Sequence, residues 1–302
     1  MKKAVLLLAF GGPPSMEEVE PFIKNVTEGH SIPETRIKMV LEQYRLIGGA
    51  SPLNAITFAE AKSLEENLKK QNHPLKVYVG LRHSKPSIQD ALLKMDQDGV
   101  EAAVGIVMAP HRSEASWNRY IHQVSNPLVT TQIKFCDPWH DHPLLIEAIT
   151  ARIEEAIKID PQIKENFWLF SAHSIPVEMD KKSDYSGQIK RTVELVAGHF
   201  SKKNWEIVYQ SRSGQPQDPW LTPDIGERIK ELAATGVESV TAIPIGFIAD
   251  HVEILYDLDI KAKTAAEEAT VDFFRVKTVG MHPKFIELLT DLVTRIPGFQ
   301  PE

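Results

Sequence analysis

The sequence has 302 residues, of which 42% are hydrophobic and 25% are charged, and its formal net charge is −7. This composition is ordinary for a globular protein of about two domains, and dispersed basic residues in an acidic chain argue against nucleic acid as a partner. The single cysteine excludes a disulfide framework and an iron–sulfur cluster held only by cysteines of this chain.

Hydrophobic runs in the sequence are too short for targeting or membrane segments. No run reaches the roughly 20 apolar residues that a membrane helix needs. The apolar opening Ala4–Phe10 is too short for a signal-peptide core and lacks a small-residue cleavage site. We therefore expect a cytoplasmic protein without a transmembrane segment, and peripheral contact with a membrane stays open.

Short apolar runs alternate with amphipathic stretches along the chain, which is the pattern of parallel sheets covered by helices. Four strands are expected in each half, at Ala4–Ala9, Lys76–Leu81, Ala102–Met108, Gln132–Cys136, Phe167–Ala172, Glu206–Gln210, Ser239–Pro244 and Asp272–Val276. Helices are expected at Phe58–Lys70, Ser87–Asp96, Tyr185–Phe200, Thr222–Ala234, His251–Leu258 and Pro283–Arg295. The predicted fold class is α/β, with two similar doubly wound domains and parallel sheets.

The two halves share a His-Pro helix start after their fourth strands, at His142-Pro143 and His282-Pro283. Proline suits the first helical position, where no backbone donor is wasted. The matching place in the strand order supports an internal duplication. We expect domains at 1–160 and 161–302, with the last helix, 283–295, packing back on the first. Two such domains leave a cleft at the carboxyl ends of their strands, where these folds bind ligands.

The loops after the first-half strands carry weak functional signals. Gly11-Gly12 allows close approach of a ligand, but it is neither a P-loop nor a complete dinucleotide fingerprint, and a tight turn explains it equally well. His83 and His111 follow the next two strands. A lone histidine after a strand is more often a hydrogen-bonded structural residue than a ligand, so we interpret both as structural.

The second half places more ionisable residues at strand ends. His173 directly follows an expected strand, and Asp250, Glu253 and Asp257 follow another. On a helix these three acids would share one face. Such a row is usually solvated surface, but beside apolar neighbours it suits a cation path. Together with His173 it is compatible with a general base and a metal-delivery site. It is not a closed zinc site, since no Cys or His pair has ligand spacing.

Several segments of the chain, in collinear order over nearly its whole length, resemble the signature segments of ferrochelatases. They are Gly11–Pro13, Ile47–Leu53, Gly80–His83, Ser171–Pro176, Gln210–Gly214, Asp218–Leu221, Gly246–Glu253 and Tyr256-Asp257. The resemblance implies two Rossmann-like domains around a porphyrin cleft and the insertion of Fe²⁺ into a porphyrin in haem biosynthesis. Its substrates would then be a porphyrin and ferrous iron. We expect a monomer with no tightly bound cofactor.

The resemblance also implies roles for individual residues. His173 and Glu253 stand where the family has its central His and Glu, which makes them the expected catalytic residues. With Asp257, which matches an acidic position further along the same helix, they are also the expected metal-handling residues. Lys261 departs from an acid found in some members, which puts any outer metal relay beyond Asp257 in doubt.

Expected porphyrin contacts lie in the first half, at Phe10, Thr27, Gln43, Tyr44, Ser51 and Tyr120. Phe10 replaces a tyrosine that can ligate iron in some bacterial enzymes, and phenylalanine has no oxygen to offer. Thr27 and Gln43 replace arginines that some relatives direct at substrate propionates. The segment 21–29 nevertheless resembles coproporphyrin-type enzymes of actinobacteria, which favours coproporphyrin III over protoporphyrin IX.

The sequence is compatible with two other functions. One is a different tetrapyrrole chelatase, such as a cobalt enzyme, because those relatives share the two-domain architecture. The other is a non-catalytic haem or porphyrin carrier, which would bind haem without forming it. The clustering of His173 with carboxylates favours chemistry over transport. The working hypothesis is that His173 accepts pyrrole protons while Glu253, backed by Asp257, relays protons or guides iron.

Overall fold

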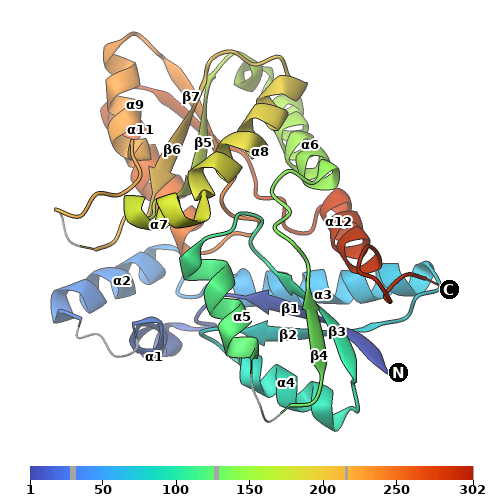
Figure 1. The fold of residues 1–302 in the computed structure, drawn as a ribbon. Helices are drawn as coiled ribbons and strands as arrows, with labels where there is room; N and C mark the ends of the chain where they lie inside the picture. The colour runs from blue at the N-terminus through green and yellow to red at the C-terminus, as the bar shows by residue number, and fades with distance from the viewer. Residues whose placement is uncertain (28–31, 126–128, 215–216, 302) are drawn as a thin grey trace. The chain divides into compact units, whose positions relative to one another are not determined.

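The computed structural model describes residues 1–27, 32–125, 129–214 and 217–301 (Figure 1). Contacts divide the chain into two compact units. Unit 1 comprises residues 1–109, 115–138 and 280–302, and unit 2 comprises residues 110–114 and 139–279. Within the described ranges, no helix is both long and apolar enough to cross a bilayer.

Unit 1 is built on a parallel four-stranded sheet in the order β2-β1-β3-β4. Its strands are β1 (Lys3–Ala9), β2 (Lys76–Leu81), β3 (Ala102–Val107) and β4 (Gln132–Phe135). The central strands β1 and β3 are buried almost throughout, because a parallel sheet carries helices on both faces. Their runs of alanine, valine, leucine and isoleucine supply the core.

Among the described residues, seven helical segments accompany this sheet. They are α1 (Met16–Val26), α2 (Glu34–Leu46), α3 (Leu53–Lys70), α4 (Ile88–Gln97), a π-helical turn (Glu114–Asn118), α5 (Arg119–Val124) and α12 (Pro283–Thr294). The last helix, α12, packs against α3, and the Asn67 side-chain amide donates a hydrogen bond to Thr290 Oγ1 over 3.0 Å. The C-terminal helix is thereby part of unit 1.

Unit 2 repeats the topology of unit 1, with a parallel sheet in the order β6-β5-β7-β8. Its strands are β5 (Phe167–His173), β6 (Trp205–Gln210), β7 (Ser239–Pro244) and β8 (Asp272–Arg275). Two parallel α/β sheets of matching order confirm the predicted fold class. Each of the eight strands begins and ends within one residue of its expected bounds.

The helices of unit 2 are α6 (Pro143–Ile159), a 3₁₀ turn (Pro161–Lys164), α7 (Val177–Ser183), α8 (Tyr185–His199), α9 (Ile225–Ala234), α10 (Val252–Leu255), a π-helical turn (Asp257–Ala262) and α11 (Lys263–Glu268). The segment after β7 therefore differs from the single helix expected at His251–Leu258. Leu258 and Ala262 of the π-helical turn join the buried core that β5, β6 and β7 share with α9. This anchors the turn in the core of unit 2.

The repeated His-Pro pairs have the same structural role in both places. His142 and His282 cap α6 and α12, each accepting a hydrogen bond through Nδ1 from the backbone N–H two residues on, over 3.2 Å. Proline occupies the first turn of each helix. By contacts, α6 groups with unit 2 and α12 with unit 1. Each helix thus follows the last strand of the other unit's sheet.

Candidate active site

His173 is the last residue of β5, the strand that lies between β6 and β7. Its ring Nδ1 contacts the carbonyl oxygen of Ser174. Because a carbonyl oxygen only accepts hydrogen bonds, Nδ1 must carry the proton and donate it. In a neutral ring the other nitrogen, Nε2, then keeps a free lone pair. The local backbone therefore presents His173 as a base.

Glu253 faces this lone pair from the first turn of α10. Its Oε2 lies 3.7 Å from His173 Nε2, and the two side chains are 35% and 29% exposed. Both groups can therefore be reached by a substrate while they interact with each other. The pair is compatible with a proton passing from the ring nitrogen to the carboxylate.

The backbone of Glu253 is held from both sides. Its N–H donates to His251 Nδ1 over 3.2 Å, and its carbonyl accepts a hydrogen bond from the side-chain amide of Gln210 at the end of β6. Burial lowers the pKa of His251 to about 4, so its ring is neutral and able to accept. These contacts fix the residue that carries the carboxylate.

Asp257, one turn after Glu253, lies deeper in the same site. The hydroxyl of Ser211 donates to its carboxylate. Burial raises the pKa of Asp257 to about 6, the Ser211 hydroxyl opposes part of this shift, and the charge of Glu253 adds to it. Ser211 adopts a left-handed conformation with φ of 61°, which is uncommon for a residue other than glycine. The end of β6 thus supports both acids.

The expectation that Asp250 shares a helix face with Glu253 and Asp257 is wrong. This residue precedes α10, and its Oδ1 accepts hydrogen bonds from Arg275 Nη1 over 3.2 Å and from Thr278 Oγ1 over 3.0 Å. Its carboxylate is therefore engaged with β8 and the loop after it. Lys261, which stands where some ferrochelatases have an acid, forms an ion pair with Asp224 over 3.7 Å.

Apolar contact shields one side of the histidines. The Phe247 ring packs edge-to-face on His173, with 6.2 Å between centroids, and on His251, with 4.4 Å. In the part of the chain that the structure describes, no three His, Cys, Asp or Glu side chains are placed to hold one metal ion together. The metal-handling role of His173, Glu253 and Asp257 therefore stays a prediction, with iron as a transient substrate.

The expected porphyrin contacts of unit 1 include an aromatic cluster. Phe10 is 40% exposed, and its ring lies 4.6 Å from the ring of His83 and 6.2 Å from that of Phe22. The Arg82 guanidinium lies 5.9 Å from the rings of both Phe10 and Tyr120. Exposed aromatic surface beside a cation is suited to stacking a flat, carboxylate-bearing ring.

The remaining expected contacts occupy neighbouring elements of unit 1. Tyr44 is buried on α2, with its ring centroid 6.5 Å from that of Phe22. Gln43 precedes it on the same helix. Thr27 caps the C-terminus of α1, and its hydroxyl donates to the Ile23 carbonyl over 2.7 Å. The last two residues of the segment 21–29, at 28 and 29, lie outside the described residues.

Ser51 and the paired glycines form one turn. The Ser51 N–H donates to the Pro13 carbonyl over 2.9 Å, and a Cβ at Gly12 would lie only 2.5 Å from the Ser51 side chain. Asn54 pairs with both the N–H and the carbonyl of Gly12, over 2.9 and 2.8 Å. Glycine is needed here for close packing. Asn54 was not predicted from the sequence, because the helix was expected to begin only at Phe58, whereas α3 begins at Leu53.

His83 and His111 have the properties of structural histidines. His83 Nδ1 lies 3.2 Å from the Asn25 side-chain oxygen, and His111 Nε2 lies 2.9 Å from the Thr192 hydroxyl. Burial lowers the pKa of His83 to about 4 and that of His111 to about 3. Both rings are therefore neutral near pH 7.

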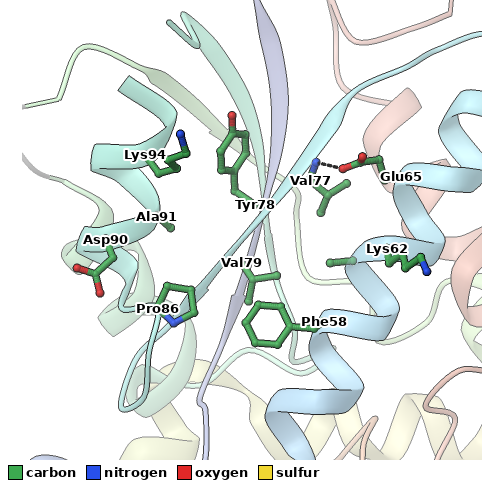
Figure 2. A pocket seen from close by; sticks show the side chains of 11 residues that line it. Phe58, Lys62, Glu65, Val77, Tyr78, Val79, Pro86, Asp90, Ala91 and Lys94 are labelled. Atoms are coloured by element: carbon green, nitrogen blue, oxygen red, sulfur yellow. Dashed lines mark hydrogen bonds between the residues drawn. The ribbon is translucent and has the colours of Figure 1, made fainter. Parts of the chain in front are cut away.

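A surface pocket of about 370 Å³ lies elsewhere in unit 1, beside the edge strand β2 and between α3 and α4. Figure 2 shows Phe58 and Val79 among its apolar lining, with the Val77 N–H donating to Glu65 over 2.9 Å. That hydrogen bond occupies a donor of the exposed strand edge. None of the expected site residues lines this pocket.

Comparison with known proteins decides the family. The family model described as ferrochelatase matches residues 2–296. The chain belongs to the ferrochelatase family. A relative from Mycobacteroides abscessus named coproporphyrin III ferrochelatase is 33% identical over 99% of this chain and 89% of its own. A relative from Thermus thermophilus named ferrochelatase is 36% identical over 96% of this chain and 98% of its own.

Solved structures support the fold of this family member. The structure of SirB from Bacillus subtilis with Fe³⁺ matches with a TM-score of 0.60 and 12% sequence identity. The match covers 97% of this chain and 94% of SirB. At this low identity the similarity shows the fold alone.

Proposed function

We propose that this protein is a ferrochelatase that inserts Fe²⁺ into a porphyrin during haem synthesis. The observation that carries the proposal is the pairing of His173 Nε2 with Glu253 Oε2 at 3.7 Å, with the opposite ring nitrogen engaged by the Ser174 carbonyl. This gives the chain a base with a defined lone pair next to a carboxylate. Membership of the ferrochelatase family indicates that the reaction is metal insertion into a porphyrin.

The chemistry requires the loss of two protons. A free-base porphyrin releases both pyrrole protons as Fe²⁺ binds its four nitrogens, so the net products are the iron porphyrin and two H⁺. His173 Nε2 accepts a pyrrole proton, and Glu253 takes it onward. Asp257, whose pKa is raised to about 6 by burial, is the next carboxyl group on the same segment. Carboxylate and imidazole also suit Fe²⁺ as ligands, so the same residues guide the metal.

Coproporphyrin III is the proposed substrate. A relative that covers nearly the whole chain carries coproporphyrin III ferrochelatase as its name, which supports this choice. The aromatic cluster around Phe10 offers a surface on which the ring can stack, and Arg82 is the nearby cation. Similarity to SirB is a matter of fold and does not favour cobalt insertion. The cytoplasmic location, the monomeric state and the lack of a resident cofactor stay part of this proposal.

The direct test of the proposed base is His173→Ala. Loss of a general base costs on the order of 10²–10⁴-fold in rate, so anaerobic Fe²⁺ insertion should fall by at least about 10²-fold. Porphyrin binding, measured by fluorescence titration, should persist. A matched control is His199→Ala, because His199 is exposed on α8, where it pairs with Glu154 over 3.6 Å and contacts the ring of Phe200. Near-normal turnover by His173→Ala would remove His173 from the mechanism.

A further inference from the structure

Arg275, the last residue of β8, connects two acids that flank the active-site segment. Its Nε and Nη2 donate to the two carboxylate oxygens of Asp259, each over 2.7 Å. Its Nη1 donates to Asp250 over 3.2 Å. The Arg275 side chain is only 13% exposed. One guanidinium therefore holds residues on both sides of Glu253.

The segment between these acids begins an irregular helical stretch. α10 has four residues, and the π-helical turn Asp257–Ala262 that follows it continues directly into α11. Because the helical repeat is broken twice within this stretch, tertiary contacts are needed to fix where Glu253 lies. On the opposite side, β6 holds the Glu253 carbonyl through Gln210 and the Asp257 carboxylate through Ser211. Arg275 is the cation on the β8 side of the same segment.

We propose that Arg275 is a positioning residue that fixes the segment from Asp250 to Asp259 and thereby aims Glu253 at His173. A bidentate arginine–carboxylate pair restricts both distance and angle. Without the guanidinium, Asp259 would lose both charged hydrogen bonds from Arg275, and Asp250 would keep the hydrogen bond from Thr278 Oγ1 but lose its nearby cation. Both ends of the segment would then shift. This inference rests on the proposed function, since it assigns Arg275 to the reaction at the His173–Glu253 pair.

The expected effect is on turnover rather than on porphyrin affinity. A displacement of about 1 Å at reacting groups can cost about 10²-fold in rate. Arg275→Met should therefore lower kcat for Fe²⁺ insertion by about 10- to 100-fold, with KM for the porphyrin changed by less than about threefold. Arg275→Lys keeps the charge but cannot hold two carboxylates in the same geometry, so its kcat should fall in between.

Arg228→Met is the matched control. Arg228 of α9 also makes a bidentate pair in unit 2, with Glu206 over 2.6 and 2.7 Å, and it contacts Glu231. Both substitutions remove a partly buried arginine from acidic partners, so both should lower the thermal unfolding midpoint. Only Arg275→Met should lower kcat. Equal kcat values for the two variants would overturn the proposal.

Two further measurements keep the proposal testable if Arg275→Met does not fold. Asp259→Asn keeps the cation and the side-chain shape but removes the charged bidentate pair, and its kcat should fall by about 3- to 10-fold; a wild-type kcat would overturn the proposal. The ring resonances of His173, followed by NMR, should shift in Asp259→Asn and stay unchanged in Arg228→Met. The NMR measurement needs no turnover, so it tests the positioning role of Arg275 by itself. The proposed function fails separately if the wild-type protein inserts no iron.

Discussion

At the scale of single residues, Glu60 of α3 is an unusual buried acid. Its side chain is 1% exposed, and neither carboxylate oxygen has a hydrogen-bond partner among the described residues. Burial raises its pKa well above the ordinary value of 4.5. An unpaired charge is far more costly to bury than a neutral group. The folded protein therefore holds Glu60 in its protonated form at pH values where an exposed glutamate is ionised.

Glu60→Gln should change the pH dependence of stability. The unfolded chain loses the Glu60 proton near its ordinary pKa, whereas the folded chain keeps it. The free energy of unfolding is therefore highest below that value and falls as the pH rises toward the folded-state pKa. Urea unfolding should show that the free energy of unfolding falls less between pH 5 and pH 8 for Glu60→Gln than for the wild type. Glu66→Gln, an exposed change on the same helix, should follow the wild type; identical pH dependence in all three would refute the assignment.

The positions of the proposed reacting residues were easier to predict from the sequence than the contacts that support them. His173 stands at a strand end, and Glu253 follows another, so alternating elements alone bring both to one edge of a sheet. The roles of Ser211 and Arg275 depend on contacts with residues 46 and 16 positions away. Such pairings are set by strand order and local backbone geometry, which no single segment encodes. The protonated nitrogen of His173 likewise depends on where the Ser174 carbonyl points.

At the scale of elements, the segment after β7 departs most from expectation. A helical period of 3.6 residues predicted one face for Asp250, Glu253 and Asp257, but the helix starts after Asp250 and continues as a π-helical turn. A π turn inserts an extra residue into the repeat and has no strong local sequence signal. α2 was missed for a different reason. Tyr44 is its only buried residue, so it lacks the apolar periodicity that marks a packed helix.

The turn at Gly12 allows a prediction for the predicted porphyrin-binding edge of unit 1. Because a Cβ there would lie 2.5 Å from the Ser51 side chain, Gly12→Ala should displace the Ser51 backbone and destabilise the protein by about 1–3 kcal/mol. Porphyrin affinity should also fall. Gly198→Ala is the control, since Gly198 lies within α8 with no atom within 4 Å of an added Cβ. That change should stabilise the protein by about 1 kcal/mol.

The stability of both variants can be measured by urea unfolding, and their porphyrin affinity by fluorescence titration. The two substitutions add the same methyl group, so a loss of stability confined to Gly12→Ala reports the close packing around Gly12. If Gly12→Ala is as stable as the wild type and binds porphyrin equally well, the turn does not position Ser51.

At the scale of the whole molecule, one topology occurs twice, but the two units carry different chemistry. Unit 2 holds the proposed base at the carboxyl end of β5 and the proposed acids after β7. Unit 1 presents the Phe10 cluster and the Ser51 turn. The duplicated topology was predictable from the apolar runs, because each buried strand reads as a short, continuous hydrophobic segment. The porphyrin substrate was not predictable in this way, because porphyrin selectivity depends on how side chains contact the substituents at the edge of the ring.

The central claim is iron insertion, and the most direct measurement is anaerobic turnover of the wild-type protein. Fe²⁺ would be supplied with coproporphyrin III and, in parallel, with protoporphyrin IX, and the iron porphyrin followed by absorbance. We predict insertion into coproporphyrin III at the higher kcat/KM. Comparable values for both porphyrins would contradict the proposed substrate preference, and no insertion into either would contradict the proposed function.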